Sequence, residues 1–495
     1  MFLIPFLTLA CSPTEKSPDE PVFTFAEPDE GPALRGPGGP SVTYSESDLW
    51  RNCAYLNGGP EDWDHHNLVM PYRGHLVLPW AAEWGRGGIS FFEVSDPCAP
   101  QKLSDSLEAQ MRETHAIGMV HLPEGDPHAG DWAVVNYSFG IQIWDIGDET
   151  APVMVSQVDL PNVFYPDSYA RVALSVYWQY PYLFVAAADN GVFVLDATDP
   201  YDPQLLTQYV FDTGLRAGGV FVIGNVALIT SAEQSSAALL DVSIPEDPQL
   251  FPGGLFGTAG ADGNPVETYH GNMAGNWAFF ARKEGGGGPI VYDISDPTNP
   301  TFVGDYLTGG NGGYVSYDEG YLFQGESDYA MVMDARDMSN ITLLGEGDLQ
   351  GDLDTIIPYG NVAVLSVDDE ADDDQASAVM PWTTDPDSVG PEVLRVEPND
   401  GAEGVPVSAR IGVGFNEPVE PTSVFAGSIR LSDEDGNAID GWGNAQENIA
   451  NFSPKEPLRP GTVYTIEVMA EGVRDINDNP LVETVTTTFT TAGSR

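Results

Sequence analysis

The sequence predicts an all-β protein, a seven-bladed β-propeller followed by a β-sandwich. Two observations carry this prediction. A unit of about fifty residues, with paired apolar strands and a closing proline turn, recurs seven times before residue 390. From residue 391 the pattern changes to short alternating strands separated by Gly, Asn and Asp turns, and about a hundred residues of this kind are typical of a sandwich.

The repeated unit is clearest in residues 182–203, YLFVAAADNGVFVLDATDPYDP. Its first half is apolar and favours a strand, and Asn190-Gly191 supplies the positive φ angles of a tight hairpin. Residues 192–195 return as a strand that is apolar on both faces, and Asp199-Pro200 ends the unit. Both faces must therefore be covered, as they are between propeller blades.

The spacing of the closing turns gives the period of the repeat. Five closing prolines lie 52, 51, 45 and 52 residues apart, a period typical of one propeller blade with several strands. They are Pro100, Pro152, Pro203, Pro248 and Pro300.

These copies resemble the LVIVD repeat, a Tyr-Ala-Tyr-Val-Ala strand followed by Leu-x-Ile-Val-Asp and Ser-Asp-Pro-x-x-Pro. Residues 182–203 and the stretch IVYDISDPTNP at 290–300 carry it most closely, and the resemblance spans about residues 48–390. It departs at Glu149, which replaces a motif proline, and at Met338 and Ile341 in the sixth copy. The resemblance implies the propeller fold and implies no particular reaction.

The seventh copy lacks a clear fourth strand. An open ring would leave strand edges unpaired, so residues 42–44 or 49–55 are expected to complete the last blade.

The chain of 495 residues is strongly acidic, with 75 acidic against 19 basic residues and a net charge of −56. Such a surface repels nucleic acid and anionic lipid, and both are excluded as partners. The acids could be an adaptation to salty water or could collect divalent cations. Their even spread along the chain favours the first explanation.

Residues 1–10, MFLIPFLTLA, resemble the end of a signal peptide, and Thr8-Leu9-Ala10-Cys11 resembles a lipobox. Cys11 is the predicted lipidation site, and Ser12 fits an outer-membrane destination. Thr8 in place of leucine, and the lack of a preceding Lys or Arg, depart from the lipoprotein pattern, and a plain cleaved signal is the alternative. The predicted location is extracytoplasmic, as an outer-membrane or cell-surface lipoprotein, or secreted without the lipid.

Residues 11–40 are rich in Pro, Glu, Asp and Gly and are predicted to be a disordered tether. The propeller is then assigned to residues 41–390 and the sandwich to residues 391–495.

The remaining cysteines are Cys53 and Cys98. An even pair in an exported protein favours a disulfide, which would fasten the incoming segment to the first blade. Two buried thiols are the alternative.

The innermost strand of each blade lines the central channel, and three copies place a histidine near it. These residues are His66, His115 and His270, and Arg171 and Arg216 precede the corresponding strands of two further copies. The imidazoles could bind a transition metal together with an acid, for which Asp62, Asp64 and Asp354 are the candidates.

Alternatively, Arg171, Arg216 and the three histidines could form a positive funnel for an anionic ligand. The third interpretation is structural, with these side chains satisfying carbonyl groups and waters around the axis. The acidic loop 368–374 lacks the glycine and the final glutamate of an EF-hand, so we expect it to be a solvated loop.

The second domain contains FNEPV at 415–419, LRPGTVYT at 458–465 and DINDNPL at 475–481. These motifs resemble bacterial Ig-like domains of the surface-layer SbsA type, which implies a spacer or an adhesion module. Structural calcium is conceivable at its acids, but Asp435-Gly436 and Asp478-Asn479 favour hairpin turns. The residues concerned are Asp433, Asp435, Asp475, Asn477 and Asp478.

Common catalytic motifs such as His-Glu-x-x-His, Gly-x-Ser-x-Gly and a phosphate-binding glycine loop are missing from the sequence. The favoured hypothesis is a lipid-anchored binding or scaffold protein with a protein or glycan ligand, which meets the membrane only through its lipid. The alternative is an extracytoplasmic hydrolase or lyase at the channel mouth. Its candidate residues are His66, His115, His270, Arg171 and Arg216, and no catalytic role is assigned to any of them.

Overall fold

The computed structural model describes residues 23–27, 39–59, 68–81, 86–108, 110–112, 114–164, 170–283, 286–372 and 375–493. The predictions for Cys11, His66, Asp62 and Asp64 concern residues outside these ranges. In the part that is described, the structure is almost entirely β, with one short 3₁₀ helix, η2 (Pro421–Ser423). None of the helical segments within these ranges has the length and hydropathy needed to span a bilayer.

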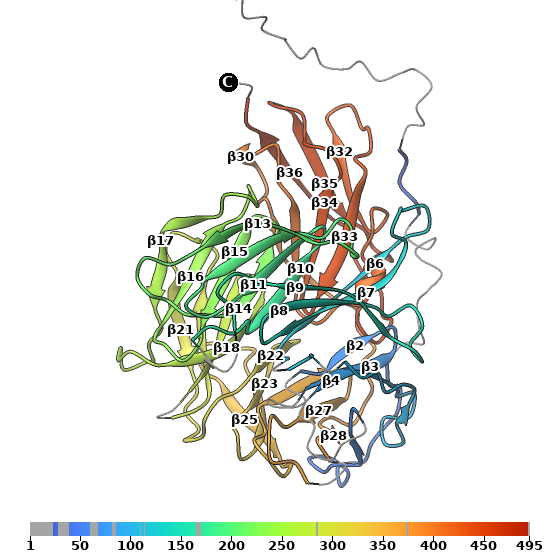
Figure 1. Cartoon of the computed structure of the whole chain (residues 1–495), viewed down its shortest axis with the longest axis vertical. Coiled ribbons are helices and arrows are strands. Elements are labelled where there is room, and N and C mark those ends of the chain that lie inside the picture. The colour runs from blue at the N-terminus through green and yellow to red at the C-terminus, as the bar shows by residue number, and fades with distance from the viewer. Residues whose placement is uncertain are drawn as a thin grey trace, which may run out of the picture.

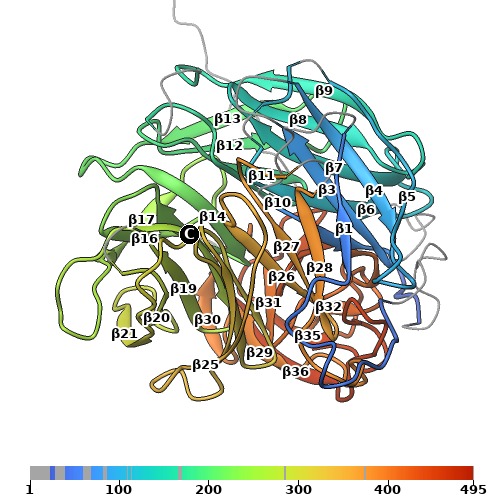
Figure 2. The same cartoon turned by 90° about the horizontal axis from the view of Figure 1, so that it is seen from below.

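Seven four-stranded antiparallel sheets form the propeller, as the sequence predicts. The first three blades are β2 (Met70–Tyr72), β3 (His75–Ala81), β4 (Gly87–Glu93), β5 (Gln101–Lys102); β6 (Ile117–Leu122), β7 (Gly130–Tyr137), β8 (Gly140–Asp145), β9 (Val153–Asp159); and β10 (Ser175–Gln179), β11 (Tyr182–Ala186), β12 (Val192–Asp196), β13 (Gln204–Tyr209). The next three are β14 (Ala217–Ile223), β15 (Val226–Ser231), β16 (Ser236–Asp241), β17 (Gln249–Gly257); β18 (Thr268–Ala274), β19 (Trp277–Arg282), β20 (Pro289–Asp293), β21 (Thr301–Asp305); and β22 (Val315–Asp318), β23 (Tyr321–Gly325), β24 (Ala330–Asp334), β25 (Thr342–Gly347). Figure 2 shows the outer strands β9, β13, β17 and β21 following one another round the edge.

The seventh blade takes strands from both ends of the propeller. It consists of β26 (Thr355–Tyr359), β27 (Val362–Ser366) and β28 (Ser377–Pro381), with β1 (Ala54–Leu56) as its outer strand. Ala54 pairs with Val379 in antiparallel register, which confirms that the N-terminal segment completes the last blade. Cys53, directly before β1, is joined by a disulfide to Cys98 in the turn after β4. The closing strand is thereby bonded to the first blade.

Apolar side chains fill the space between consecutive blades. The cluster between the seventh and first blades packs Tyr359 and Val362 with Leu76 and Phe92, all nearly inaccessible to solvent. Similar clusters join the first blade to the second and the sixth to the seventh. Strands that are apolar on both faces therefore cover one another around a closed ring.

The acid that ends the third strand of a blade has a structural role. Five of these carboxylates accept a hydrogen bond, of 2.8 to 3.1 Å, from the backbone N–H two residues further on. Such a turn stops the strand and directs the chain to the outer strand. The five residues are Asp145, Asp196, Asp241, Asp293 and Asp334.

The C-terminal domain is a sandwich of two four-stranded sheets. Phe415, Phe452, Ile466 and Phe489 lie in its core. One sheet contains β29 (Val393–Glu397), β31 (Ile411–Phe415), β34 (Ile449–Pro454) and β33 (Gly441–Gln446); the other contains β30 (Ala402–Val405), β36 (Val485–Thr491), β35 (Val463–Val468) and β32 (Ile429–Asp433). Figure 1 shows this domain, in orange and red, standing on one side of the propeller.

The sandwich packs on the face that we call the floor, formed by the seven turns between the innermost and second strands of the blades. Five floor turns hydrogen-bond to the domain: Arg73 to Glu420, Asp126 to Trp442, Tyr180 to Asn444, Gly224 to Asn451, and Glu319 to Asn416. The other two turns approach it closely, Gly275 beside Gly414 and Gly360 beside Asn477. The domain was expected to be a spacer. Its contact with every blade makes it a cover for the floor instead.

Two described parts of the expected tether also lie on the sandwich. Arg430 Nη2 donates to the carbonyl oxygen of Ala26 at 2.9 Å, and its guanidinium lies 5.3 Å from the centre of the Phe25 ring. Gly39 N donates to Ile476 O at 3.0 Å. These residues are therefore docked, which differs from the free tether expected there.

Candidate functional site

The central channel is closed at its floor end by a hairpin of the sandwich. We call β33, β34 and the turn between them the plug hairpin. Glu447 in this turn accepts a hydrogen bond from Asn272 of β18 at 2.6 Å. The next residue, Asn448, donates to Tyr317 O of β22 at 3.1 Å. The plug hairpin therefore closes the floor end of the channel, and we call the face opposite the floor the open face.

A cavity of about 30 Å³ lies above the plug hairpin, a volume on the scale of one or two water molecules. Apolar and small side chains form most of its wall, with Val220, Phe221 and Ile357 among them. The polar part of the wall comprises His115, His270, Tyr314, Gln446 and Glu447, with Asn272 and two serines.

The structure brings together two of the three predicted histidines. The ring centroids of His115 and His270 lie 5.9 Å apart, and the phenol of Tyr314 stacks on His270 at 4.0 Å. The Tyr314 hydroxyl donates to His115 O at 3.1 Å and lies 3.3 Å from His115 Nδ1. Asn136 fixes the backbone here, because its Oδ1 accepts the N–H groups of His115 and Ala116.

His270 is held as a neutral imidazole. Burial, helped by the nearby charges of His115 and Lys283, lowers the pKa of His270 well below its usual value. Its Nε2 is buried and has no hydrogen-bond partner among the described residues. A neutral ring nitrogen of this kind can accept a proton or a hydrogen bond, or ligate a metal.

Charged groups of both signs surround the histidines on the open face. The ammonium of Lys283 lies 4.6 Å from the centre of the Tyr269 ring. Burial raises the pKa of Glu326 to about 7, although Thr308, Gly288 and Gln324 donate hydrogen bonds to it. Burial also raises the pKa of Asp354 well above its usual value, and the charge of Lys283 opposes that shift.

The plug hairpin contributes a carboxyl group with a similarly perturbed pKa. Burial raises the pKa of Glu447 to about 7, and the hydrogen bond from Asn272 opposes the shift. Glu447 borders the channel cavity and also a second cavity of about 30 Å³ between the floor and the sandwich. Glu447 therefore lies between the channel cavity and the interface of the propeller with the sandwich.

The two predicted arginines do not join the histidines. Arg216 Nε pairs with Asp189 at 2.9 Å, in a half-exposed ion pair of the kind that contributes little to stability. Arg171 is exposed, and its guanidinium lies 5.4 Å from the centre of the Phe164 ring. Neither residue lines the cavity, so the expected positive funnel is corrected: His115 and His270 line the cavity without the arginines. The charge of Arg216 is already met by an acid of the neighbouring turn.

Among the described residues, the groups of three side chains that could hold one ion are both acidic. One is Asp352, Asp354 and Asp368, and the other is Asp387, Glu417 and Asp475. The proposed transition-metal site of His66, His115 and His270 stays a prediction, since His66 is outside the described ranges. In the sandwich, Asp433 forms the expected turn, where it accepts hydrogen bonds from Asp435 N and Asn437 N.

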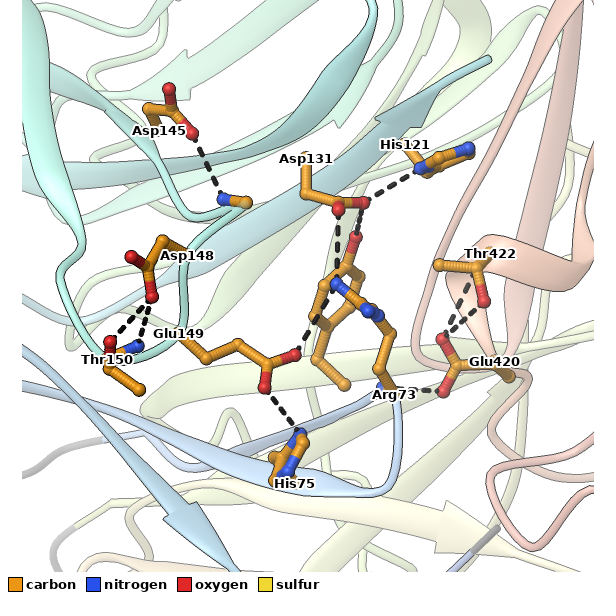
Figure 3. A network of polar contacts seen from close by, with 12 residues as sticks. Arg73, His75, His121, Asp131, Asp145, Asp148, Glu149, Thr150, Glu420 and Thr422 are labelled. Atoms are coloured by element: carbon orange, nitrogen blue, oxygen red, sulfur yellow. Dashed lines mark hydrogen bonds and ion pairs between the residues drawn. The ribbon is translucent and has the colours of Figure 1, made fainter. Parts of the chain in front are cut away.

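A second polar network, shown in Figure 3, joins the first two blades to the sandwich at the floor. Asp131 accepts hydrogen bonds from Tyr72 and His121, and Arg73 lies between Asp131 and Glu149. Glu420 of the sandwich accepts the backbone N–H of Arg73. The acids here have partners on several sides, which fits a structural role.

Sequence reasoning missed Tyr314, Asn272 and Glu447. Each becomes part of the site through a contact between residues more than a hundred positions apart, such as Asn272 with Glu447. The turn around Glu447 could have been recognised as a hairpin tip, but no local signal says that it enters the channel.

Comparison with known families agrees with both domains. The family described as LVIVD repeat matches residues 173–210 and 272–308, which are the third and fifth blades. The family described as bacterial Ig-like domain matches residues 387–491. The chain is therefore a β-propeller that contains LVIVD repeats and carries a bacterial Ig-like domain.

Among curated proteins no significant sequence match is found. Similar solved structures include U3-55K, with 10% identity and a TM-score of 0.48 over 68% of this chain and 99% of that chain. The β-propeller domain of Myceliophteria thermophila Cps50 (Swd1) has 10% identity and a TM-score of 0.47 over 66% and 98%. The computationally designed Ika8 protein has 11% identity and a TM-score of 0.44 over 67% and 99%. Identities this low bear on nothing beyond fold.

Proposed function

We propose that this protein is a cell-surface binding or scaffold protein that takes a protein or glycan ligand on the open face of its propeller. The observation that carries the proposal is the closed floor. The Ig-like domain contacts all seven floor turns and the plug hairpin fills the channel from below. The face opposite the floor is then the one left for a ligand, with the buried His115–His270–Tyr314 group beneath its loops.

A hydrolase or lyase acting at the same place is the second candidate, and one observation favours it. His270 is neutral, buried and has an unpartnered Nε2 within the described part of the chain, as a general base requires. Substrate turnover that is lost in His270→Gln and kept in Asp202→Asn would support this candidate. Asp202 is an exposed residue in the turn between β12 and β13, at the floor edge.

The binding function is tested with the full chain on a glycan array and on an array of purified surface proteins. We expect ligands whose signal falls at least about tenfold in His270→Gln and Lys283→Gln, which corresponds to about 1.4 kcal/mol of binding free energy. Asp202→Asn is the matched control and should bind like the unmodified chain. Ligands bound equally by all four proteins would place the binding surface elsewhere and contradict the proposal.

The surface location rests on the lipobox at Cys11 and on the Ig-like domain, which is a module of extracellular and surface proteins. We expect the chain expressed in a Gram-negative host to incorporate radiolabelled palmitate and to fractionate with the outer membrane. Cys11→Ser should abolish the label and release the protein. An unlabelled chain in the soluble fraction would refute the lipid anchor and leave a secreted protein.

A further inference from the structure

Three carboxylates from separate parts of the chain meet where the propeller joins the Ig-like domain, and the charge of a fourth, Asp318, acts on them. We call Asp318, Asp387, Glu417 and Asp475 the junction carboxylates. Asp318 ends β22, Asp387 lies between β28 and β29, Glu417 follows β31, and Asp475 lies between β35 and β36. Asp387, Glu417 and Asp475 each place a carboxylate oxygen within 4.8 Å of the others.

Two of these groups are deeply buried. The exposed fraction of Asp475 is 0% and that of Glu417 is 3%. Glu417 Oε1 accepts a hydrogen bond from no residue that the structure describes. Burial of an ionised carboxylate without a partner is strongly unfavourable, so this oxygen needs either a proton or a cation.

The charges around the junction carboxylates are themselves negative. The groups that act on Glu417 are Asp318, Asp475, Asp387 and Glu319. The adjacent cation, Arg474, points elsewhere, because its Nη1 donates to Asp478 O at 2.7 Å. Burial and the neighbouring carboxylates raise the pKa of Glu417 to about 12, and burial and the adjoining Asp387 raise that of Asp475 to about 8. A bound cation would offset the repulsion between these carboxylates and lower the free-energy cost of burying them in ionised form.

The carboxylates are already oriented by groups behind them. Asp475 Oδ1 accepts the N–H groups of Asn477 and Asn479, both at 2.8 Å. The side-chain amide of Asn479 donates to Asp475 Oδ2 at 2.8 Å and to Asp387 Oδ2 at 3.1 Å. The Asn479 amide therefore fixes the carboxylates of Asp387 and Asp475 relative to each other, as residues that support metal ligands do.

The donor atoms decide which cation fits. All are carboxylate oxygens, without sulfur or imidazole, and hard oxygen donors favour calcium or magnesium over transition metals. Several carboxylates on independent loops suit the six to eight oxygens and flexible geometry of calcium better than the compact hydrated octahedron of magnesium. Asp387 is partly exposed, which leaves a path for the ion from solvent.

We propose that the junction carboxylates form a calcium site that fastens the Ig-like domain to the floor of the propeller. The ion would join the interdomain linker to two loops of the Ig-like domain, with the charge of Asp318 of the sixth blade acting on the same site. This inference is independent of the proposed binding function, because the site lies on the floor side, away from the open face.

The test uses the full chain, stripped with a chelator and dialysed against calcium or magnesium. We expect calcium to bind, measured by equilibrium dialysis and elemental analysis, and to raise the unfolding temperature by about 3 °C or more at saturation. Magnesium should give a smaller shift. A stripped chain that neither binds calcium nor shifts its unfolding temperature would overturn the proposal.

Two matched variants assign the site. Glu417→Gln should lose one bound calcium and the associated thermal shift. In the stripped state at neutral pH it should be more stable than the unmodified chain, because the raised pKa of Glu417 means that the glutamate must take up a proton to be buried, whereas the glutamine need not. Asp352→Asn changes the other acidic group and should keep both responses. Loss of the calcium response in Asp352→Asn and its retention in Glu417→Gln would refute the junction site.

Discussion

At the scale of single residues, the main result is that several carboxyl groups are held where their protonated form is favoured. Glu447 is the clearest case, because it lies at the contact between the plug hairpin and the channel wall. Burial raises its pKa from 4.5 to about 7. Since the native pKa is the higher one, its contribution to stability is complete below about pH 4.5 and is lost as the pH rises through 7.

Glu447→Gln should therefore flatten part of the dependence of stability on pH. The glutamine keeps an oxygen for Asn272 and carries no charge. We expect the variant to match the unmodified chain near pH 5 and to be more stable at pH 8 by at most about 3 kcal/mol, the difference between the two pKa values. Urea unfolding at both pH values measures it, and equal stability at pH 8 would contradict the assignment.

At the scale of elements, the aspartate that ends the third strand of five blades explains part of the composition. Asp196 accepts hydrogen bonds from Thr198 N at 2.9 Å and from Thr198 Oγ1 at 2.6 Å. The same kind of turn recurs at Asp145 and Asp293. These acids serve turn geometry, so a fraction of the negative charge has a local structural cause and need not reflect solvent or ligand.

Asp196→Ala should destabilise the propeller by about 1–3 kcal/mol, the range for hydrogen bonds to a charged acceptor. Asp196→Asn should cost less because it keeps an acceptor oxygen. Asp212→Ala, at an exposed position, is the control and should change stability by less than about 0.5 kcal/mol. Thermal unfolding of the three variants measures the order of their stabilities. Equal losses of stability in all three would refute the role of the turn.

The closing strand is the second element with a clear mechanical role. β1 is three residues long and pairs only with β28, and Cys53 beside it is linked to Cys98 across 45 positions. A short edge strand contributes little on its own, so the covalent link should matter.

The variant with Cys53→Ser and Cys98→Ser should lose about 3–4 kcal/mol by the loop-entropy relation for a link of this length. Protease treatment should then cut the chain before residue 68 sooner than in the oxidised protein. Equal cleavage rates in the two proteins would show that pairing to β28 alone holds the strand.

At the scale of the whole molecule, the interface between the two domains is organised around Asn451 of the Ig-like domain, whose exposed fraction is 0%. Its Oδ1 accepts Gly224 N and Gln179 Nε2, both at 2.8 Å. Its Nδ2 donates to Val222 O at 2.9 Å and to the Tyr177 hydroxyl at 3.2 Å. One amide thus satisfies groups on two blades and couples the folding of the two domains.

Asn451→Leu keeps the approximate shape and leaves these groups unpaired, with an expected loss of several kcal/mol. We expect the unmodified chain to unfold in a single calorimetric transition and the variant to unfold in two, one for each domain. Ser453→Ala, on the same strand, is the control and should unfold in one transition. A single transition at reduced temperature in Asn451→Leu would instead show that the domains remain coupled without this residue.

The sequence predicted the fold well because its signals are local and repeated. The Asn190-Gly191 turn and the aspartate that ends the third strand of five blades mark the propeller, and FNEPV marks the second domain. The prediction that an N-terminal segment closes the ring of blades followed from the missing fourth strand of the seventh copy, and residues 54–56 form that strand. The site could be predicted less well from the sequence. Asn272, Glu447 and Asn451 make their contacts only when the two domains dock, and docking depends on a surface shape that a single sequence does not display.

The position of residues 23–27 bears on how the molecule would stand above a bilayer. These residues lie on the Ig-like domain through Ala26 and Arg430, and Gly39 bonds to Ile476 of the same domain. A lipid at Cys11 would then hold the protein by its Ig-like end, with the histidine pair turned outward. The open face of the propeller would then be turned toward the surroundings of the cell, within reach of neighbouring surfaces.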